Sequence, residues 1–177
     1  MIVTLIGVTG CGKTKVGTML ADACGWEFHD ADDFHPAENV AKMKSGAPLD
    51  DEDRRPWLAR LNTFLIESER QGKSLVLACS ALKQVYRDRL ARGCAAARFV
   101  FLDGDIELIR ARLAARQGHY MNPRLLDSQF AILERPADAL RPPLTPARTR
   151  PTGAGWSLRL TAWPPKLLRS CASCFAP

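Results

Sequence analysis

The sequence predicts an α/β fold in which a doubly wound parallel sheet carries helices on both faces. Short apolar runs rich in β-branched residues alternate with longer segments whose apolar residues recur at helical spacing, which is typical of a parallel sheet with crossover helices. A glycine-rich loop, residues 7–14, separates the first run from the first helical segment. At 177 residues the chain is long enough for one domain with a substantial core and short for two.

Each expected element follows from its hydrophobic period and its bounding residues. The run Ile2–Ile6 is apolar, β-branched and ended by glycine, as a buried parallel strand would be. Acidic residues at 51–53 suit the start of a long helix, where negative charge interacts favourably with the helix dipole. Further strands are expected at 26–29, 74–79 and 98–102. Helices are expected at 13–24, 39–44, 50–71, 82–91, 105–116 and 124–133.

The charge distribution argues against a nucleic-acid-binding domain. The composition is ordinary for a globular protein, with 46% hydrophobic and 25% charged residues. Up to Glu134, 18 Lys and Arg balance 18 Asp and Glu, so the net charge of +6 comes from the seven basic residues and one acid after it. A neutral body with a basic tail does not provide the basic face that binds nucleic acid.

The sequence has no pattern of a membrane span, a signal peptide or a paired-cysteine framework, which bears on the compartment and on the thiol state. No apolar run approaches the roughly 20 residues of a membrane-spanning helix, and the first residues have no signal-peptide pattern. Six cysteines are scattered, and a disulfide from the one in the glycine-rich loop would obstruct binding. Cys171 and Cys174 form one C-x-x-C without the second pair of a structural zinc site. We expect a cytoplasmic protein with reduced thiols and no membrane partner.

The glycine-rich loop has the sequence of a phosphate-binding loop. It reads Gly7-Val8-Thr9-Gly10-Cys11-Gly12-Lys13-Thr14 and matches G-x-x-x-x-G-K-[ST]. Its glycines let the backbone turn so that successive N–H groups, including that of Cys11, face the phosphates of ATP at a helix N-terminus. We expect Lys13 to bridge the β- and γ-phosphates and the Thr14 hydroxyl to ligate Mg²⁺. The N-K-x-D motif that reads guanine in GTPases is absent from the sequence.

An acidic segment, residues 30–36, follows the second expected strand. Its carboxylates should therefore lie at the carboxyl edge of the sheet, where open α/β folds bind ligands. Asp30 could hold Mg²⁺ through water, while Asp32 accepts the proton of an attacking hydroxyl. A solvated acidic loop is the alternative, and the neighbouring phosphate loop favours the catalytic interpretation.

These motifs and the blocks after them resemble the gluconate kinase family, itself similar to shikimate kinases and nucleoside monophosphate kinases. The resemblance covers residues 2–136. Its blocks are Asp30-Ala31-Asp32 with His35-Pro36, Lys42 to Leu49 with Asp51, Asp53, Arg54, Pro56, Trp57 and Leu58, Cys79 to Lys83 with Tyr86-Arg87-Asp88, Arg116 to Met121, and Leu126, Ser128-Gln129 and Leu133-Glu134. It implies a P-loop kinase fold with a lid, Mg-ATP as donor, transfer to the 6-hydroxyl of D-gluconate to give 6-phosphogluconate, and a homodimer.

Three residues are candidates for the polar end of the acceptor. Gluconate carries a carboxylate, and the guanidinium of Arg54 suits a bidentate contact with it. A surface ion pair of Arg54 with Asp50 or Asp51 is the alternative. Ser80 and Lys83, after the third expected strand, could hold the polar end of the substrate or the transferring phosphate.

The remaining candidates come from other segments. His35 could bind a substrate hydroxyl, and Gln129 is a further candidate substrate contact. Arg116 and His119 fall in the connection where related kinases carry a mobile lid, so Arg116 could neutralise charge in the transition state and His119 could contact the substrate. Arg112, one helical turn earlier, could flank the adenine. Simple solvated arginines are the alternative for Arg112 and Arg116.

The end of the chain departs from the family pattern. Eight of the 12 prolines lie in residues 136–177, acids nearly vanish, and no apolar strand of the expected kind follows Glu134. We interpret residues 1–136 as the kinase domain and 137–177 as an atypical tail that reflects a change of reading frame or disorder. The alternatives to an active gluconokinase are a nucleotide-binding protein that this tail has left with little catalysis, and a kinase for another hydroxy acid such as shikimate.

Overall fold

The protein has the predicted α/β fold. The computed structural model describes residues 1–114 and 123–142. Its four-stranded parallel sheet has the order β2-β3-β1-β4. The strands are β1 (Ile2–Ile6), β2 (Glu27–Asp30), β3 (Leu75–Ala78) and β4 (Ala97–Phe101). Every strand expected from the sequence is present.

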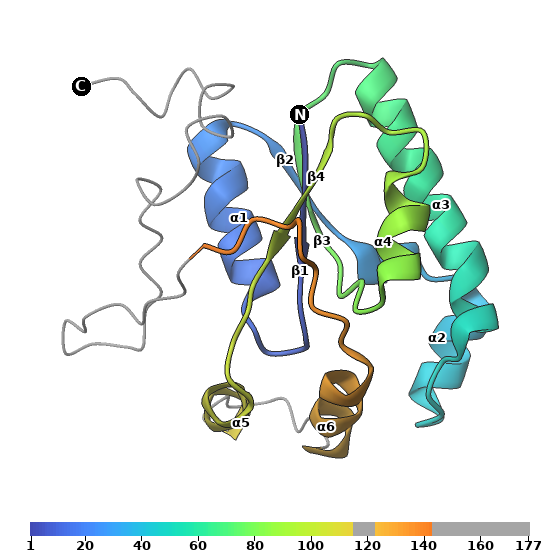
Figure 1. Cartoon of the computed structure of the whole chain (residues 1–177). Coiled ribbons are helices and arrows are strands. Elements are labelled where there is room, and N and C mark those ends of the chain that lie inside the picture. The colour runs from blue at the N-terminus through green and yellow to red at the C-terminus, as the bar shows by residue number, and fades with distance from the viewer. Residues whose placement is uncertain (115–122, 143–177) are drawn as a thin grey trace.

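Helices cover both faces of this sheet, as expected. Helix α1 (Lys13–Cys24) lies on one face, and α3 (Asp51–Arg70) and α4 (Gln84–Ala91) lie on the other (Figure 1). The end of the molecule toward which the strands run carries α2 (Ala37–Lys44), α5 (Ile106–Ala114) and α6 (Pro123–Ile132). A short 3₁₀ helix, η1 (Ala31–Phe34), connects β2 to α2. Across the described residues, no helix combines the length and apolar character needed to span a bilayer.

Alternation along the central strand divides the core into two layers. Val3 and Leu5 of β1 pack in the cluster that contains α1, whereas Ile2 and Ile6 pack in the cluster that contains α3 and α4. Successive side chains of a strand point to opposite faces of the sheet, so β1 contributes to both layers. A strand that is buried on both faces does not alternate between apolar and polar residues. The face of α3 toward the sheet is made of leucines, namely Leu58, Leu61 and Leu65.

A buried arginine ties two distant segments together. Arg87 of α4 is only 3% exposed. Its guanidinium donates hydrogen bonds to the carbonyls of Ala81 (2.9 Å) and Leu82 (3.0 Å) in the loop after β3, and to the carbonyl of Glu134 (2.9 Å) after α6. The Glu134 N–H also donates to the Leu82 carbonyl at 3.0 Å. Because a buried guanidinium is costly unless its donors are satisfied, this set of bonds fixes the loop after β3.

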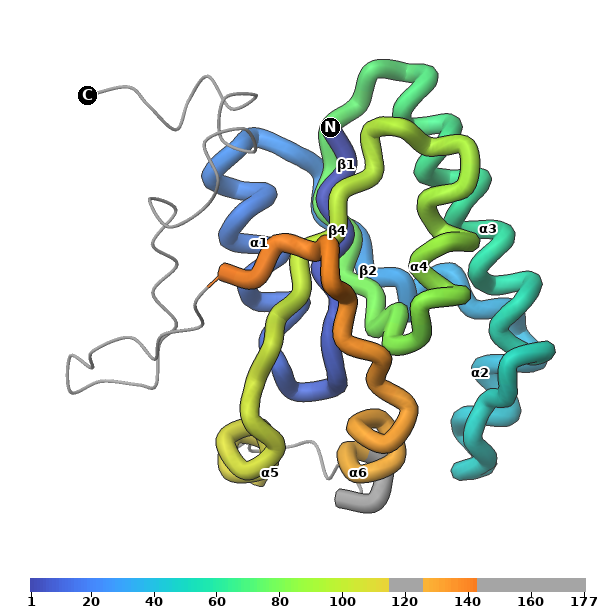
Figure 2. The backbone as a smooth tube through the Cα atoms, viewed as in Figure 1, coloured from blue at the N-terminus to red at the C-terminus, as the bar shows by residue number. Residues whose placement is uncertain are grey.

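The chain after α6 returns to the outer edge of β4 (Figure 2). The Leu140 N–H donates to the Phe99 carbonyl (3.1 Å) and its carbonyl accepts from the Phe101 N–H (2.8 Å), which makes a parallel bridge opposite Val100. The sequence predicted no strand here. Residues 135–142 indeed form no strand, although Leu140 makes an isolated bridge to β4.

The packing of α3 against the sheet predicts a large stability difference between two leucines. Leu58 is fully buried in the α3 layer, so Leu58→Ala should lower the free energy of unfolding by about 2–5 kcal/mol. Leu108→Ala, on an exposed position of α5, should change it by about 0.5 kcal/mol or less. Denaturant unfolding of both variants measures this difference, and equal losses would contradict the assignment of Leu58 to the core.

Candidate active site

The phosphate loop connects β1 to α1 and has the backbone that glycine permits. Gly7 has a φ of 142°, and a Cβ on it would lie 2.9 Å from both the Cys11 Sγ and the Leu102 carbonyl oxygen. Gly12 caps α1 in the left-handed region, with a φ of 101°. These two positions require glycine because of conformation and, at Gly7, because of close approach to a neighbouring strand end.

Lysine 13 bends back over this loop. Its Nζ donates to the Gly7 carbonyl at 2.9 Å and to the Val8 carbonyl at 3.0 Å. The ammonium is therefore held across the mouth of the loop, where it would meet an anion bound to the loop N–H groups. Cys11 is buried under the loop, and burial raises the pKa of its thiol. A neutral thiol in this position fills space and adds no charge to the loop.

A hydroxyl and a carboxylate meet beside the loop. The Thr14 hydroxyl of α1 donates to Asp30 Oδ2 at 3.4 Å, and Asp30 Oδ1 accepts from the Asp32 N–H at 3.1 Å as the N-cap of η1. The capping bond holds the Asp30 side chain toward Thr14. Two oxygen donors of these kinds are the ligands that Mg²⁺ prefers, so this pair fits a magnesium ion.

Asp32 lies next to the charged groups of the loop. Desolvation by the surrounding protein raises the pKa of its carboxyl, and the Asp30 carboxylate raises it further, whereas His35 and Lys13 oppose the shift. The Asp32 side chain nevertheless keeps 84% of its surface exposed, so solvent limits the desolvation. The carboxylate is thus open to a ligand and lies within the field of Lys13.

His35 is held rigidly below Asp32. Its ring stacks on Trp57 at 4.5 Å between centroids and 11° between planes, and its side chain is only 6% exposed. Burial lowers the pKa of the imidazole, which favours the neutral ring. The Asn39 amide nitrogen lies 3.4 Å from Nδ1, which assigns the proton to Nε2, 4.0 Å from Asp32 Oδ1. A neutral donor therefore points toward Asp32.

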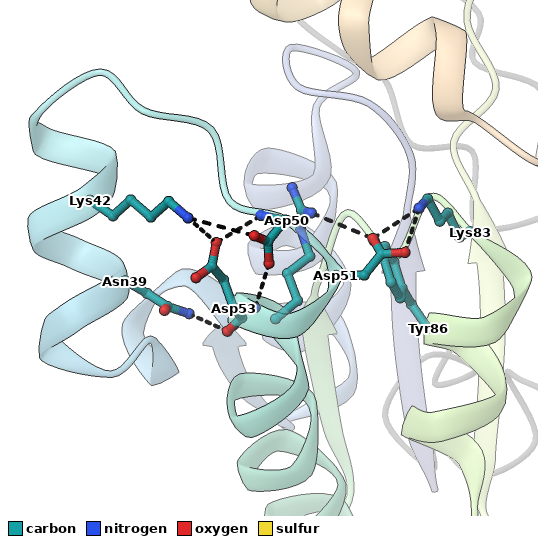
Figure 3. A network of polar contacts seen from close by, with 8 residues as sticks. Asn39, Lys42, Asp50, Asp51, Asp53, Lys83 and Tyr86 are labelled. Atoms are coloured by element: carbon teal, nitrogen blue, oxygen red, sulfur yellow. Dashed lines mark hydrogen bonds and ion pairs between the residues drawn. The ribbon is translucent and has the colours of Figure 1, made fainter.

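Asp51 of α3 meets Lys83, the residue before α4, and Tyr86 of α4 (Figure 3). Lys83 donates to both oxygens of Asp51, at 2.9 and 2.7 Å, and the Tyr86 hydroxyl donates to the same carboxylate. Arg54 lies 3.9 Å from Asp51 Oδ1, which is the ion pair considered from the sequence, at a loose distance. Two cations that the sequence suggested for the acceptor side, Arg54 for a carboxylate and Lys83 for the polar end of the substrate or the transferring phosphate, thus share one aspartate.

The other candidates occupy distinct places. The Ser80 carbonyl accepts from the Gly7 N–H at 3.2 Å, so the loop after β3 contacts the phosphate loop directly. Gln129 of α6 accepts from the Thr9 N–H at 2.6 Å through Oε1, which places it on the phosphate loop. Burial lowers the pKa of the Arg112 guanidinium on α5, and Cys11 lies in its field.

Arg116, His119, Cys171 and Cys174 lie outside the described residues, so the predictions made for them stay predictions. Among the described residues, no group of three or more His, Cys, Asp or Glu side chains could hold a metal ion.

Sequence reasoning did not assign the roles of two residues. Asp51 was considered at the acidic start of the long helix, in a block of the family resemblance and as a partner for Arg54, and the buried position of Arg87 was not recognised. Arg87 lies with Tyr86 and Leu90 on the buried face of α4. An arginine at a helical position that shares a face with apolar residues is the sequence signal that indicates its burial.

Comparison with known proteins places this geometry in a family. A family model described as shikimate kinase matches residues 9–137. The chain is 47% identical over 154 residues to a probable gluconokinase of Rattus norvegicus, with 77% of this chain and 83% of the relative covered. It is 48% identical over 132 residues to the thermosensitive gluconokinase of Escherichia coli K12, with 75% and 71% covered. The chain belongs to the gluconokinase family.

Solved structures agree with this membership. A gluconokinase from Sinorhizobium meliloti superposes with a TM-score of 0.71 at 39% identity, covering 78% of this chain and 79% of that one. An unliganded sugar kinase from Janibacter superposes with a TM-score of 0.72 at 44% identity, covering 79% and 82%. The resemblance and the P-loop kinase fold expected from the sequence are thereby confirmed. The shikimate kinase description of the family model fits the likeness between the two families that the motifs indicated.

The contact between Gln129 and the phosphate loop predicts a nucleotide effect. Gln129→Ala removes the acceptor of the Thr9 N–H, so the loop should be less preorganised and the Kd for ATP should rise about threefold to tenfold. Gln71→Ala, at the exposed end of α3, is the matched control. Titration with ATP measures both variants, and an unchanged Kd would show that this bond does not support the loop.

Proposed function

We propose that the protein transfers the γ-phosphoryl group of ATP to the 6-hydroxyl of D-gluconate, giving 6-phospho-D-gluconate and ADP. The observation that carries this proposal is a row of charged groups at one sheet edge. Lys13 acts on Asp32 electrostatically, Asp32 lies 4.0 Å from His35 Nε2, and Arg54 in turn acts on His35. Groups that would bind phosphate, accept a proton and bind a carboxylate thus follow one another in the order that a phosphorylated sugar acid would require.

The donor side uses the loop between β1 and α1. The N–H groups of Gly12, Lys13 and Thr14 at the start of α1 would hold the phosphates of ATP, since those of Gly7 and Thr9 donate to Ser80 and Gln129. Lys13 would leave its two carbonyl partners to contact the β- and γ-phosphates. Thr14 and Asp30 would hold Mg²⁺, which when bound neutralises charge on the phosphate oxygens. Asp30 keeps its orientation through the Asp32 N–H, so the metal ligand and the base are set by the same capping turn.

The acceptor side uses Asp32 and His35. Asp32 would accept the proton of the 6-hydroxyl as that oxygen bonds to the γ-phosphorus and the bond from phosphorus to the bridging oxygen of ADP breaks. The Nε2–H of His35 would donate to a sugar hydroxyl and orient the chain of the substrate. Because its ring is stacked on Trp57 and buried, His35 would be a preorganised donor.

The roles of the remaining candidates rest on their placement or on the sequence. Ser80 and Gln129 contact the phosphate loop, Lys83 pairs with Asp51, and Arg112 interacts electrostatically with Cys11 of the loop. Arg116 would stabilise the charge that spreads over the transferring phosphoryl group, and His119 would contact the substrate; both assignments rest on the motif alone.

The acceptor is tested by coupled measurement of ADP release. With Mg-ATP, turnover should require D-gluconate, and shikimate should support at most about 1% of the gluconate kcat/KM, because a kinase site that hydrogen-bonds several hydroxyls rejects an acceptor of different shape. Turnover with shikimate alone would favour the shikimate alternative. ATP binding without turnover of either acceptor would favour the alternative in which the tail abolishes catalysis.

The base is tested by a substitution that keeps its shape. Asp32→Asn should lower kcat by about 10²–10⁴-fold, because the amide cannot accept the proton, while the Kd for ATP should change less than about threefold. Asp33→Asn, on the same 3₁₀ helix, is the matched control. Steady-state kinetics and ATP titration separate the two effects, and an unchanged kcat in Asp32→Asn would remove Asp32 from the mechanism.

A further inference from the structure

Asp51, in the first turn of α3, binds Lys83 at the N-cap of α4 and Tyr86 within α4 (Figure 3). Both of its oxygens accept from Lys83 Nζ, at 2.9 and 2.7 Å, and Oδ1 also accepts from the Tyr86 hydroxyl. These bonds lower the pKa of the Asp51 carboxyl, and the bond to Asp51 raises the pKa of Lys83. Asp51 and Lys83 are therefore both charged and directly paired.

The neighbouring aspartates, Asp50 and Asp53, cap the start of α3. Asp50 caps α3 by accepting from the Asp53 N–H at 2.8 Å, and Asp53 accepts from the Asp50 N–H at 2.8 Å. Lys42 of α2 donates to Asp53 at 2.5 Å. Figure 3 shows these side chains on the side of α2, with Asp51 turned the opposite way toward α4. The start of α3 is therefore capped without Asp51, whose carboxylate instead accepts hydrogen bonds from Lys83 and Tyr86.

Arg54 is placed differently from Lys83 in the same cluster. Both cations flank the ring of Tyr86, at 5.8 and 5.6 Å from its centroid. Lys83 is bound to Asp51 by two short contacts, whereas the nearest Arg54 nitrogen lies 3.9 Å from that carboxylate. Arg54 is 25% exposed, and its charge lowers the pKa of His35, so Arg54 lies within electrostatic range of the acceptor side.

The charges of this cluster leave one positive unit. Arg54 and Lys83 contribute two positive charges and Asp51 contributes one negative charge. A sugar-acid carboxylate brings one negative charge, which the cluster balances. If Lys83 were neutral, the negative charge of Asp51 would offset the positive charge of Arg54 and would repel the incoming carboxylate.

We propose that Asp51 is a specificity-determining residue, which neutralises Lys83 and leaves Arg54 as the cation that binds the acceptor carboxylate. In this arrangement Lys83 is a positioning residue that acts through Asp51 and does not itself bind the substrate. The inference rests on the proposed function, since it requires an acceptor that carries a carboxylate.

A double-mutant cycle in the full chain tests it. The variants are Lys83→Met, Asp51→Asn and the two combined, because Asn keeps an acceptor for the Tyr86 hydroxyl and Met keeps the length of the lysine. Lys83→Met leaves the cluster without net charge, so the KM for gluconate should rise at least about tenfold while kcat changes less than about threefold. The combined variant restores one positive unit, so its KM should return to within about threefold of the wild-type value.

A second lysine provides the matched control. Lys42 pairs with Asp53 at the same helix start, on the side away from Tyr86, so Lys42→Met should leave the KM for gluconate within about twofold of wild type. Thermal unfolding of every variant identifies any rise in KM that comes from misfolding, and Lys83→Gln gives a second neutral substitution at that site.

The outcomes separate the inference from the function on which it rests. A combined variant with the high KM of Lys83→Met would overturn the inference, because Lys83 would then bind the carboxylate itself. An Arg54→Gln variant with a wild-type KM would also overturn it. A wild-type protein that shows no turnover of gluconate would overturn the proposed function instead.

Discussion

The parallel ladder through β1 is the constraint on which the site depends. Because β1 pairs with both β3 and β4 and all strands run the same way, the segments that follow them leave the sheet at one edge. The contact is direct: the Gly7 N–H donates to the Ser80 carbonyl after β3, and a Cβ on Gly7 would strike the Leu102 carbonyl after β4. A change in register would therefore alter the phosphate loop itself.

Helix-end chemistry supplies the second layer of order. Asp30 caps η1 and at the same time meets Thr14, and Asp50 and Asp53 form a reciprocal capping box at the start of α3. These caps fix neighbouring carboxylates in different directions. In each of these short acidic segments, one carboxylate therefore caps a helix while a neighbouring one stays available for other contacts.

The segment after α6 is joined to the acceptor side through a buried charge. Arg87 bonds the carbonyls of Ala81 and Leu82 and also that of Glu134, and Ala81 has the strained φ of 37° in the loop that leads to Lys83. A few residues later, Leu140 pairs with the edge of β4. The contacts of the loop after β3 and of the β4 edge thus extend to the point where the sequence departs from the family pattern.

The sequence by itself determined the elements and the donor side of the site, because hydrophobic period and the G-x-x-x-x-G-K-[ST] spacing are local properties of the chain. It named Arg54 for the acceptor carboxylate, Lys83 for the polar end of the acceptor or the transferring phosphate, and Gln129 as a candidate substrate contact. Only the tertiary structure placed Gln129 on the Thr9 N–H and Asp51 on Lys83. The physical reason is that these contacts join residues 120 and 32 positions apart, and the distance between them is decided by how the helices pack on the sheet.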